Sequence, residues 1–245
     1  MATQETVRFE AVRIHTDDLG RATRAYARLL GCPPERAGDD LVRFGLGRGA
    51  VELVPGTPGA QALRLACGTG TGAEAALAAA RAARFGGLDV LVDPPLADTY
   101  GAASQRAELT PTRGGFLAVD HVVVNTTNPG RAIALWRDTL GVRLALDREF
   151  PARGLRMLFF RSAGVTLEVV SPIGAAAAGD DVQHGVAYRV AELARVRTRL
   201  LDDGFDVSTV RDGNKRGTLV ATVRAGTEGV PTLLIEALPD DDGRG

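Results

Sequence analysis

The chain has 245 residues, with 29 Lys and Arg against 30 Asp and Glu and a formal net charge of −1. This length accommodates two domains of ordinary size, and the balanced charge indicates neither a nucleic-acid nor a membrane-surface partner. No stretch approaches the ~18 uncharged apolar residues of a membrane span, and no apolar core of signal-peptide length opens the chain. The two cysteines, Cys32 and Cys67, are expected to be reduced thiols in a cytoplasmic protein.

The first elements along the chain are predicted from residue spacing. Residues 7–14 form a strand, and a helix over 19–31 has apolar residues at helical spacing, a cap at Asp17 or Asp18 and a stop at Gly31. Residues 41–44 and 50–54 follow as two strands around the turn GLGRG. The beginning of the chain therefore has the order strand, helix, strand, strand.

Two segments of this first part recur later in the chain. The helix LGRATRAYARLLG (19–31) matches PGRAIALWRDTLG (129–141), with five identities at an offset of 110. The strands VRFGLGRGAVELV (42–54) match LFFRSAGVTLEVV (158–170), which places Glu52 on Glu168 at an offset of 116. The chain therefore contains an internal duplication whose unit is a strand, a helix and a run of strands, βαβββ.

A second unit follows each of these repeats, with a weaker sequence signal. In the first half the prediction is a strand over 62–67, a helix over 73–85 and strands near 88–92 and 102–109. In the second half it is a strand over 184–190, a helix over 191–204 and strands over 205–210, 218–224 and 232–238. We therefore predict an α+β fold of four βαβββ modules in two domains, 1–113 and 114–245.

The second half carries a repeated pattern of histidine and glutamate. His121 and His184 each open a strand-like run, and each is followed by a strand with a glutamate among apolar residues, Glu168 after 47 residues and Glu236 after 52. A single strand histidine is more often an ordinary core or surface residue, but a buried carboxylate is costly unless it is paired or bound to a metal. Two imidazoles and two carboxylates suit Zn, Fe, Mn, Co or Ni rather than Ca. The repeated pattern therefore predicts one divalent-metal site.

This pattern resembles the vicinal oxygen chelate superfamily, which includes glyoxalase I, methylmalonyl-CoA epimerase, the fosfomycin and bleomycin resistance proteins and the extradiol dioxygenases. The resemblance covers nearly the whole chain as a fold and is most specific over 116–238. It implies two glyoxalase-like domains with cup-shaped mixed sheets, and metal ligands on the first and last strands of each module. By position these ligands are His121, Glu168, His184 and Glu236. The C-terminal half, with VQH (182–184) and PTLLIE (231–236), is also similar to 4-hydroxyphenylpyruvate dioxygenase and glyoxalase I.

The first half departs from the family's pattern. Ala11 stands where His121 stands, Gly68 falls near the position of His184, and only Glu52 is retained. We therefore expect a first domain without metal ligands, in which Glu52 has a structural role rather than one at a partner surface.

Three functions are compatible with the resemblance. The favoured one is a glyoxalase- or epimerase-type isomerase or lyase, which chelates adjacent oxygens of a small substrate and stabilises an enolate-like intermediate, with Glu168 or Glu236 as base. An Fe(II) dioxygenase would use His121, His184 and Glu236. It is disfavoured because residues 217–236 lack the further His and Tyr of the extradiol signature. A metal-free small-molecule binding or resistance protein is the third.

Some polar residues are weaker candidates. Asn125 and Tyr188 could contact substrate, although ordinary packing explains such residues more often. Arg161, Arg224 and Lys215 could receive a substrate carboxylate, although most such charges are solvated. The expected partner is a small molecule with adjacent oxygens, and the resemblance allows a homodimer.

Overall fold

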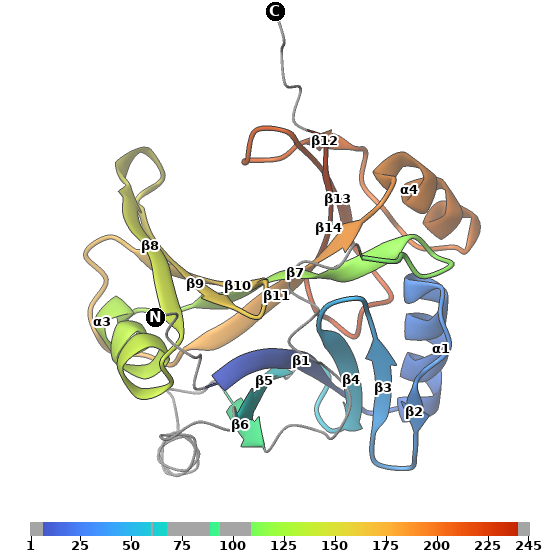
Figure 1. Cartoon of the computed structure of the whole chain (residues 1–245), viewed down its shortest axis with the longest axis horizontal. Helices are drawn as coiled ribbons and strands as arrows, with labels where there is room; N and C mark the ends of the chain where they lie inside the picture. The colour runs from blue at the N-terminus through green and yellow to red at the C-terminus, as the bar shows by residue number, and fades with distance from the viewer. Residues whose placement is uncertain (1–6, 60, 68–88, 94–108, 240–245) are drawn as a thin grey trace, which may run out of the picture.

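The computed structural model describes residues 7–59, 61–67, 89–93 and 109–239 of the chain. Their strands form two separate sheets, and the helices lie on the outside (Figure 1). The first sheet contains β1 (Val7–Thr16), β2 (Arg36–Ala37), β3 (Val42–Gly45), β4 (Ala50–Pro55), β5 (Gln61–Cys67) and β6 (Asp89–Asp93). The second contains β7 (Phe116–Asn125), β8 (Arg143–Phe150), β9 (Leu155–Ser162), β10 (Val165–Pro172), β11 (Val182–Val190), β12 (Arg211–Asp212), β13 (Thr218–Val223) and β14 (Thr232–Ala237).

Local sequence explains where the helices begin and end. The helix α1 (Leu19–Leu30) begins after Asp18, whose side chain accepts a hydrogen bond from Arg21 N–H, and ends at Gly31 with φ 65°. The short helix α3 (Pro129–Ile133) starts after Asn128 in the same way and continues as the π-helical turn η2 (Ala134–Thr139). The 3₁₀ turn η3 (Pro151–Arg153) joins β8 to β9, and α4 (Leu193–Asp202) follows β11.

The two sheets share one pairing scheme. In the first, with order β2-β3-β4-β1-β5-β6, the strand β1 pairs parallel with β4 and antiparallel with β5. In the second, with order β12-β13-β14-β11-β7-β10-β9-β8, the strand β7 pairs parallel with β10 and antiparallel with β11. The predicted α+β class, with two glyoxalase-like domains and mixed sheets, is confirmed.

Some predicted elements differ from the structure. The strand predicted over 205–210 is reduced to one bridge between Val207 and Val223, and the short β12 follows it. The strand β8, with Asp, Glu and Arg among its residues, was not predicted because its alternation is weak. The helix predicted over 73–85 and most of the strand predicted over 102–109 lie outside the described residues. The proposed domain boundary at 113/114 falls just before β7.

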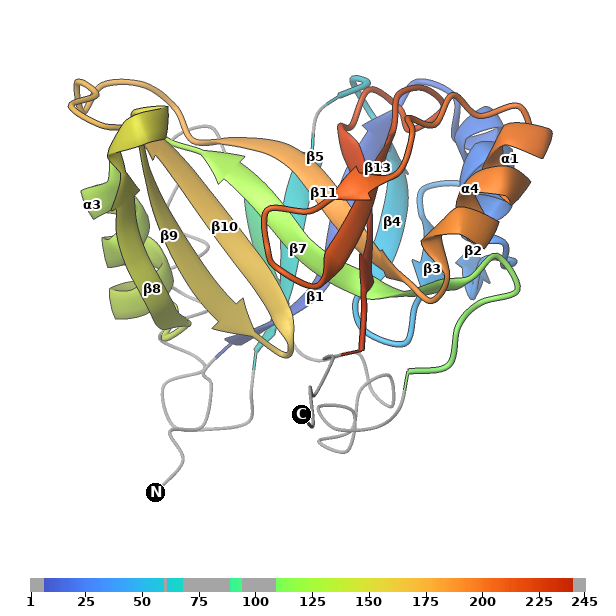
Figure 2. The same cartoon turned by 90° about the horizontal axis from the view of Figure 1, so that it is seen from above.

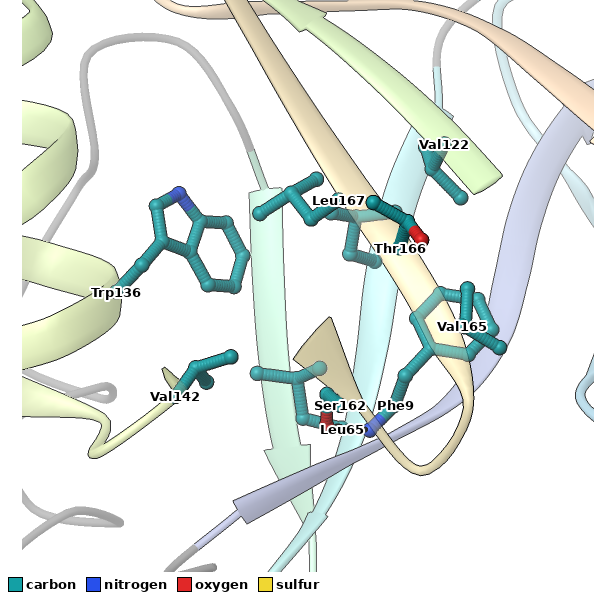
Figure 3. Close-up of a pocket in the computed structure, with 10 residues that line it drawn as sticks. Phe9, Leu65, Val122, Trp136, Val142, Ser162, Val165, Thr166 and Leu167 are labelled. Carbon is teal, nitrogen blue, oxygen red and sulfur yellow. Dashed lines mark hydrogen bonds between the residues drawn. The ribbon is translucent and has the colours of Figure 1, made fainter. Parts of the chain in front are cut away.

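The second sheet is strongly curved, with β8 forming one wall and β12 and β13 the other (Figures 1 and 2). Its convex side packs on α3, α4 and the first sheet, so the concave side faces away from the rest of the molecule. Figure 3 shows the contact between the sheets, where Phe9 and Leu65 lie near Val122, Trp136 and Leu167 around a small apolar cavity. The Phe9 N–H donates to Ser162 Oγ at 2.8 Å across this contact.

The described segments contain no helix that is both long and apolar enough to cross a membrane.

Candidate active site

The strand β7 presents alternate side chains to the two sides of the curved sheet. Val122 and Val124 are each 1% exposed and belong to the core on the convex side. Successive side chains of a strand point to opposite faces, so His121, Val123 and Asn125 face the concave side. The concave face is therefore where His121 could meet a small molecule.

A bulge brings an acidic residue onto the same face as His121. His121 is in register with Ala187 and Val119 with Tyr188, so Asp120 is an extra residue of β7. Asp120 Oδ2 lies 3.0 Å from His121 Nδ1, and Asp120 Oδ1 accepts a hydrogen bond from Arg189 Nη2 at 2.7 Å. Because an ionised carboxylate only accepts hydrogen bonds, this contact places a proton on Nδ1 and leaves Nε2 available. The Asp120 carboxylate thus orients the imidazole.

The charges of this group shift the pKa values of both partners. Burial raises the pKa of Asp120, but the hydrogen bond with His121 and the charge of Arg189 lower it by more, so the pKa falls to about 2. For His121, burial lowers the pKa, while the hydrogen bond to Asp120 and the charge of Glu168 raise it, and the raising effects win. The structure therefore favours an ionised Asp120 beside an imidazole that retains a proton.

Glu168 lies on the same face, on the neighbouring strand β10. Thr166 is in register with His121, and Glu168 with Val123, so Glu168 is two residues along the sheet from the imidazole. Burial raises the pKa of Glu168, and the charge of His121 only partly offsets this. Within the described segments the Glu168 carboxylate forms no hydrogen bond. Glu168 and His121 are therefore a partly buried base and acid that influence each other.

Glu236 lies on the other side of the sheet. In β14, Leu234 is fully buried on the convex side and in register with Tyr188. Glu236 is two residues farther along the strand, so its side chain is on the same convex side. The N–H of Leu193, the first residue of α4, donates to Glu236 Oε2 at 2.8 Å. The preceding Glu192 makes no capping bond of its own, so Glu236 serves as the acceptor for this helix start. The structure does not bring Glu236 to His121.

The remaining candidates on β11 are divided between the two faces. His184 is exposed and is the extra residue of a second bulge, since Gln183 is in register with Val124 and Gly185 with Val123. Gln183 is buried on the convex side, so His184 points to the concave side, as His121 does. Tyr188 is fully buried on the convex side, and burial raises its pKa. Asn125, at the end of β7, is exposed on the concave face.

A family model matches most of the second sheet, which forms the concave face. Residues 120–222 match the model of the Glyoxalase/Bleomycin resistance protein/Dioxygenase superfamily. This part of the chain is similar to that superfamily. The match spans less than half of the chain, but it confirms the resemblance predicted from the sequence. No curated protein matches the chain.

The similarity to solved structures is more distant. The methylmalonyl-CoA epimerase from Mycobacterium tuberculosis is 18% identical, with a TM-score of 0.44, over 56% of this chain and 96% of its own. A hypothetical protein from Bacillus halodurans is 16% identical, with a TM-score of 0.42, over 51% and 96% of the two chains. These likenesses are too weak to carry a substrate or a mechanism over to this chain.

The four ligands that the superfamily resemblance implies do not fit one metal ion in this structure. His121, Glu168 and His184 face the concave side, whereas Glu236 faces the convex side and is bonded to α4. Across the described residues there is no group of three or more His, Cys, Asp or Glu side chains placed to hold a metal ion. The alternation of side chains along β14 separates the fourth ligand from the others.

Sequence reasoning missed Asp120 and Arg189, which complete the group around His121. Asp120 directly precedes His121, so ordinary alternation would place it on the opposite face. Only the bulge in β7, which depends on pairing with β11, brings the two side chains together. A carboxylate next to a histidine in the sequence was the available signal, and it is a weak one.

Proposed function

We propose that the chain catalyses a redox-neutral proton transfer on a small molecule at the concave face of the second sheet, as an isomerase or lyase of glyoxalase or epimerase type. The observation that carries this proposal is that Glu168 and His121 lie on one face of neighbouring strands, two residues apart in register, and that each charge affects the other's pKa. The carboxyl of Glu168 and the imidazole of His121 both have raised pKa values, and within the described residues Nε2 of His121 has no hydrogen bond. Paired groups with shifted pKa values are typical of acid–base sites.

Glu168 is the base in this proposal. Its ionised carboxylate takes a proton from a substrate carbon next to a carbonyl group, and the electron pair of the C–H bond moves onto the carbonyl oxygen. A raised pKa makes the carboxylate a stronger base, which suits this step. Return of the proton to a different face or atom gives an isomer, and loss of a neighbouring group gives a lyase product.

His121 is the acid. Its Nδ1 is held by Asp120, so a proton on Nε2 can be donated to the oxygen on which negative charge develops. Asp120 is itself paired with Arg189, which keeps the carboxylate ionised and the ring in one orientation. Asp120 and Arg189 are positioning residues, since they act through His121.

Activity should depend on pH in a bell shape. Glu168 must be deprotonated, so activity falls as pH drops below its raised pKa. His121 must be protonated, so activity also falls as pH rises above its raised pKa. The window between the two is therefore the active range.

The test is exchange of substrate C–H for deuterium in D₂O, followed by NMR on a panel of 2-hydroxy ketones, 2-oxo acids and 2-substituted 3-oxo thioesters. Glu168→Gln should slow exchange by about 10²–10⁴-fold, while Glu236→Gln should not change it, since that carboxylate lies on the convex side. Exchange that survives in Glu168→Gln and disappears in Glu236→Gln would overturn the assignment.

A divalent metal at this face stays a prediction from the family resemblance, although the described residues bring no three of its predicted ligands together. Elemental analysis of the purified protein and of His184→Ala tests it. The dioxygenase alternative depends on His121, His184 and Glu236, and the sheet separates Glu236 from the two histidines. A metal-free binding protein would show ligand binding but no deuterium exchange.

A further inference from the structure

One wall of the concave face carries arginines that have no acidic partner among the described residues. Arg161 on β9 is in register with Arg143 on β8, and Arg148 lies farther along β8, opposite Met157. All three are exposed, and none forms an ion pair or a hydrogen bond within the part of the chain that the structure describes. Arg148 packs over the Phe150 ring at 5.2 Å. By contrast, Arg156 on the convex side of β9 is paired with Asp147 at 2.7 Å.

Arg161 is the arginine that reaches the proton-transfer site. It is in register with Thr166, which is in register with His121, so Arg161 and His121 occupy one row across three strands. The charge of Arg161 lowers the pKa of both His121 and Glu168. A guanidinium with its donors unused therefore lies close to both reacting groups.

The surface next to Arg161 is apolar. Phe159 is in register with Glu168 and with Leu146, and Met157 follows on the same face of β9. Leu146 is 45% exposed and extends this apolar surface from β9 onto β8. An apolar strip bordered by free guanidinium groups is suited to a ligand with an anionic end and an apolar body.

We propose that the substrate is a carboxylate with an apolar body, whose carboxylate pairs with Arg161 while its apolar part lies on Phe159 and Met157. A guanidinium binds the two oxygens of a carboxylate in a fixed geometry. In this proposal, a C–H next to a separate carbonyl group of the same molecule faces Glu168 and His121. The inference rests on the proposed function for the reaction, but the binding of the carboxylate can be measured without any turnover.

The test uses hexanoate and its neutral analogue hexanol as probes, with binding followed by NMR of the full-length protein. Hexanoate should bind more tightly than hexanol and shift the His121 ring signals. Arg161→Gln should weaken hexanoate binding by about tenfold or more and leave hexanol binding unchanged. Arg156→Gln is the matched control, since it removes an arginine from the same strand on the other face.

Two outcomes overturn the inference. Equal affinity for hexanoate and hexanol would remove the role of the charge, and equal effects of Arg161→Gln and Arg156→Gln would remove the role of the position. Specific hexanoate binding without deuterium exchange would leave this inference standing and would contradict the proposed function instead.

Discussion

Glu52 in the first sheet and Glu168 in the second stand at matching positions of a duplicated module, yet their surroundings are opposite. Glu52 is fully buried, and its carboxylate forms ion pairs with three arginines. The nitrogen atoms are Nη1 of Arg43 at 2.6 Å, Nη1 of Arg64 at 2.8 Å and Nη2 of Arg13 at 2.8 Å. Burial raises the pKa of Glu52, but the hydrogen bonds and charges of the arginines lower it by more, so the net shift is downward. For Glu168 burial prevails and the pKa rises.

Different residues at matching strand positions account for the opposite pKa shifts of Glu52 and Glu168. Arg13 of β1 is in register with Glu52, where β7 has Val123 beside Glu168. Arg64 of β5 is in register with Ala11, the residue that replaces His121. The first sheet has therefore closed its acid within an ion-pair cluster, whereas the second keeps its acid able to titrate. The same sheet position can stabilise the fold or hold a proton, depending on the neighbouring strands.

The largest expected effect comes from breaking the ion-pair cluster. Glu52→Gln leaves three guanidinium groups with too little negative charge in a buried site, so the free energy of unfolding should fall by about 3–5 kcal/mol. Urea denaturation followed by circular dichroism measures this. Glu168→Gln is the matched substitution in the second sheet. It should leave the free energy of unfolding unchanged or slightly higher, because burial disfavours the charged carboxylate that the substitution removes. Equal losses in both variants would contradict the comparison.

A smaller effect is expected at Asp120. Its pKa is lowered to about 2, so its ionised form stabilises the fold above the pKa of the unfolded chain, near 3.9. That stability is lost as pH falls through the folded pKa. Asp120→Asn should therefore lower the free energy of unfolding at pH 7 by about 2 kcal/mol. The difference from the parent protein should shrink between about pH 4 and pH 2. A difference that does not depend on pH would show that the loss is one of packing.

The smallest effect is expected at Glu236. Glu236→Ala removes the acceptor of the Leu193 N–H at the start of α4, which should cost about 1 kcal/mol. Glu236→Gln keeps an oxygen acceptor and should retain most of that stability. Thermal unfolding of the two variants checks the order. Equal losses would indicate that the negative charge, rather than the hydrogen bond, stabilises the helix start.

The sequence by itself determined the modular architecture and half of the site. The repeated helix and strand segments predicted the duplication, because hydrophobic spacing and capping residues act within one element. His121 and Glu168 were found because the order of His and Glu recurs along the second half of the chain, at His184 and Glu236. Their convergence on one face follows from the parallel pairing of β7 with β10.

Only the tertiary structure decided on which face the other candidates lie. A bulge shifts alternation by one residue, and it depends on the partner strand rather than on local sequence. For this reason Asp120 joins His121 and His184 turns to the concave side. Glu236 has ordinary alternation, but its face follows from the register of β14 against β11. Arg156 has an acidic partner, whereas Arg161 has none within the described part of the chain, and this difference depends on contacts between strands that no single strand's sequence contains.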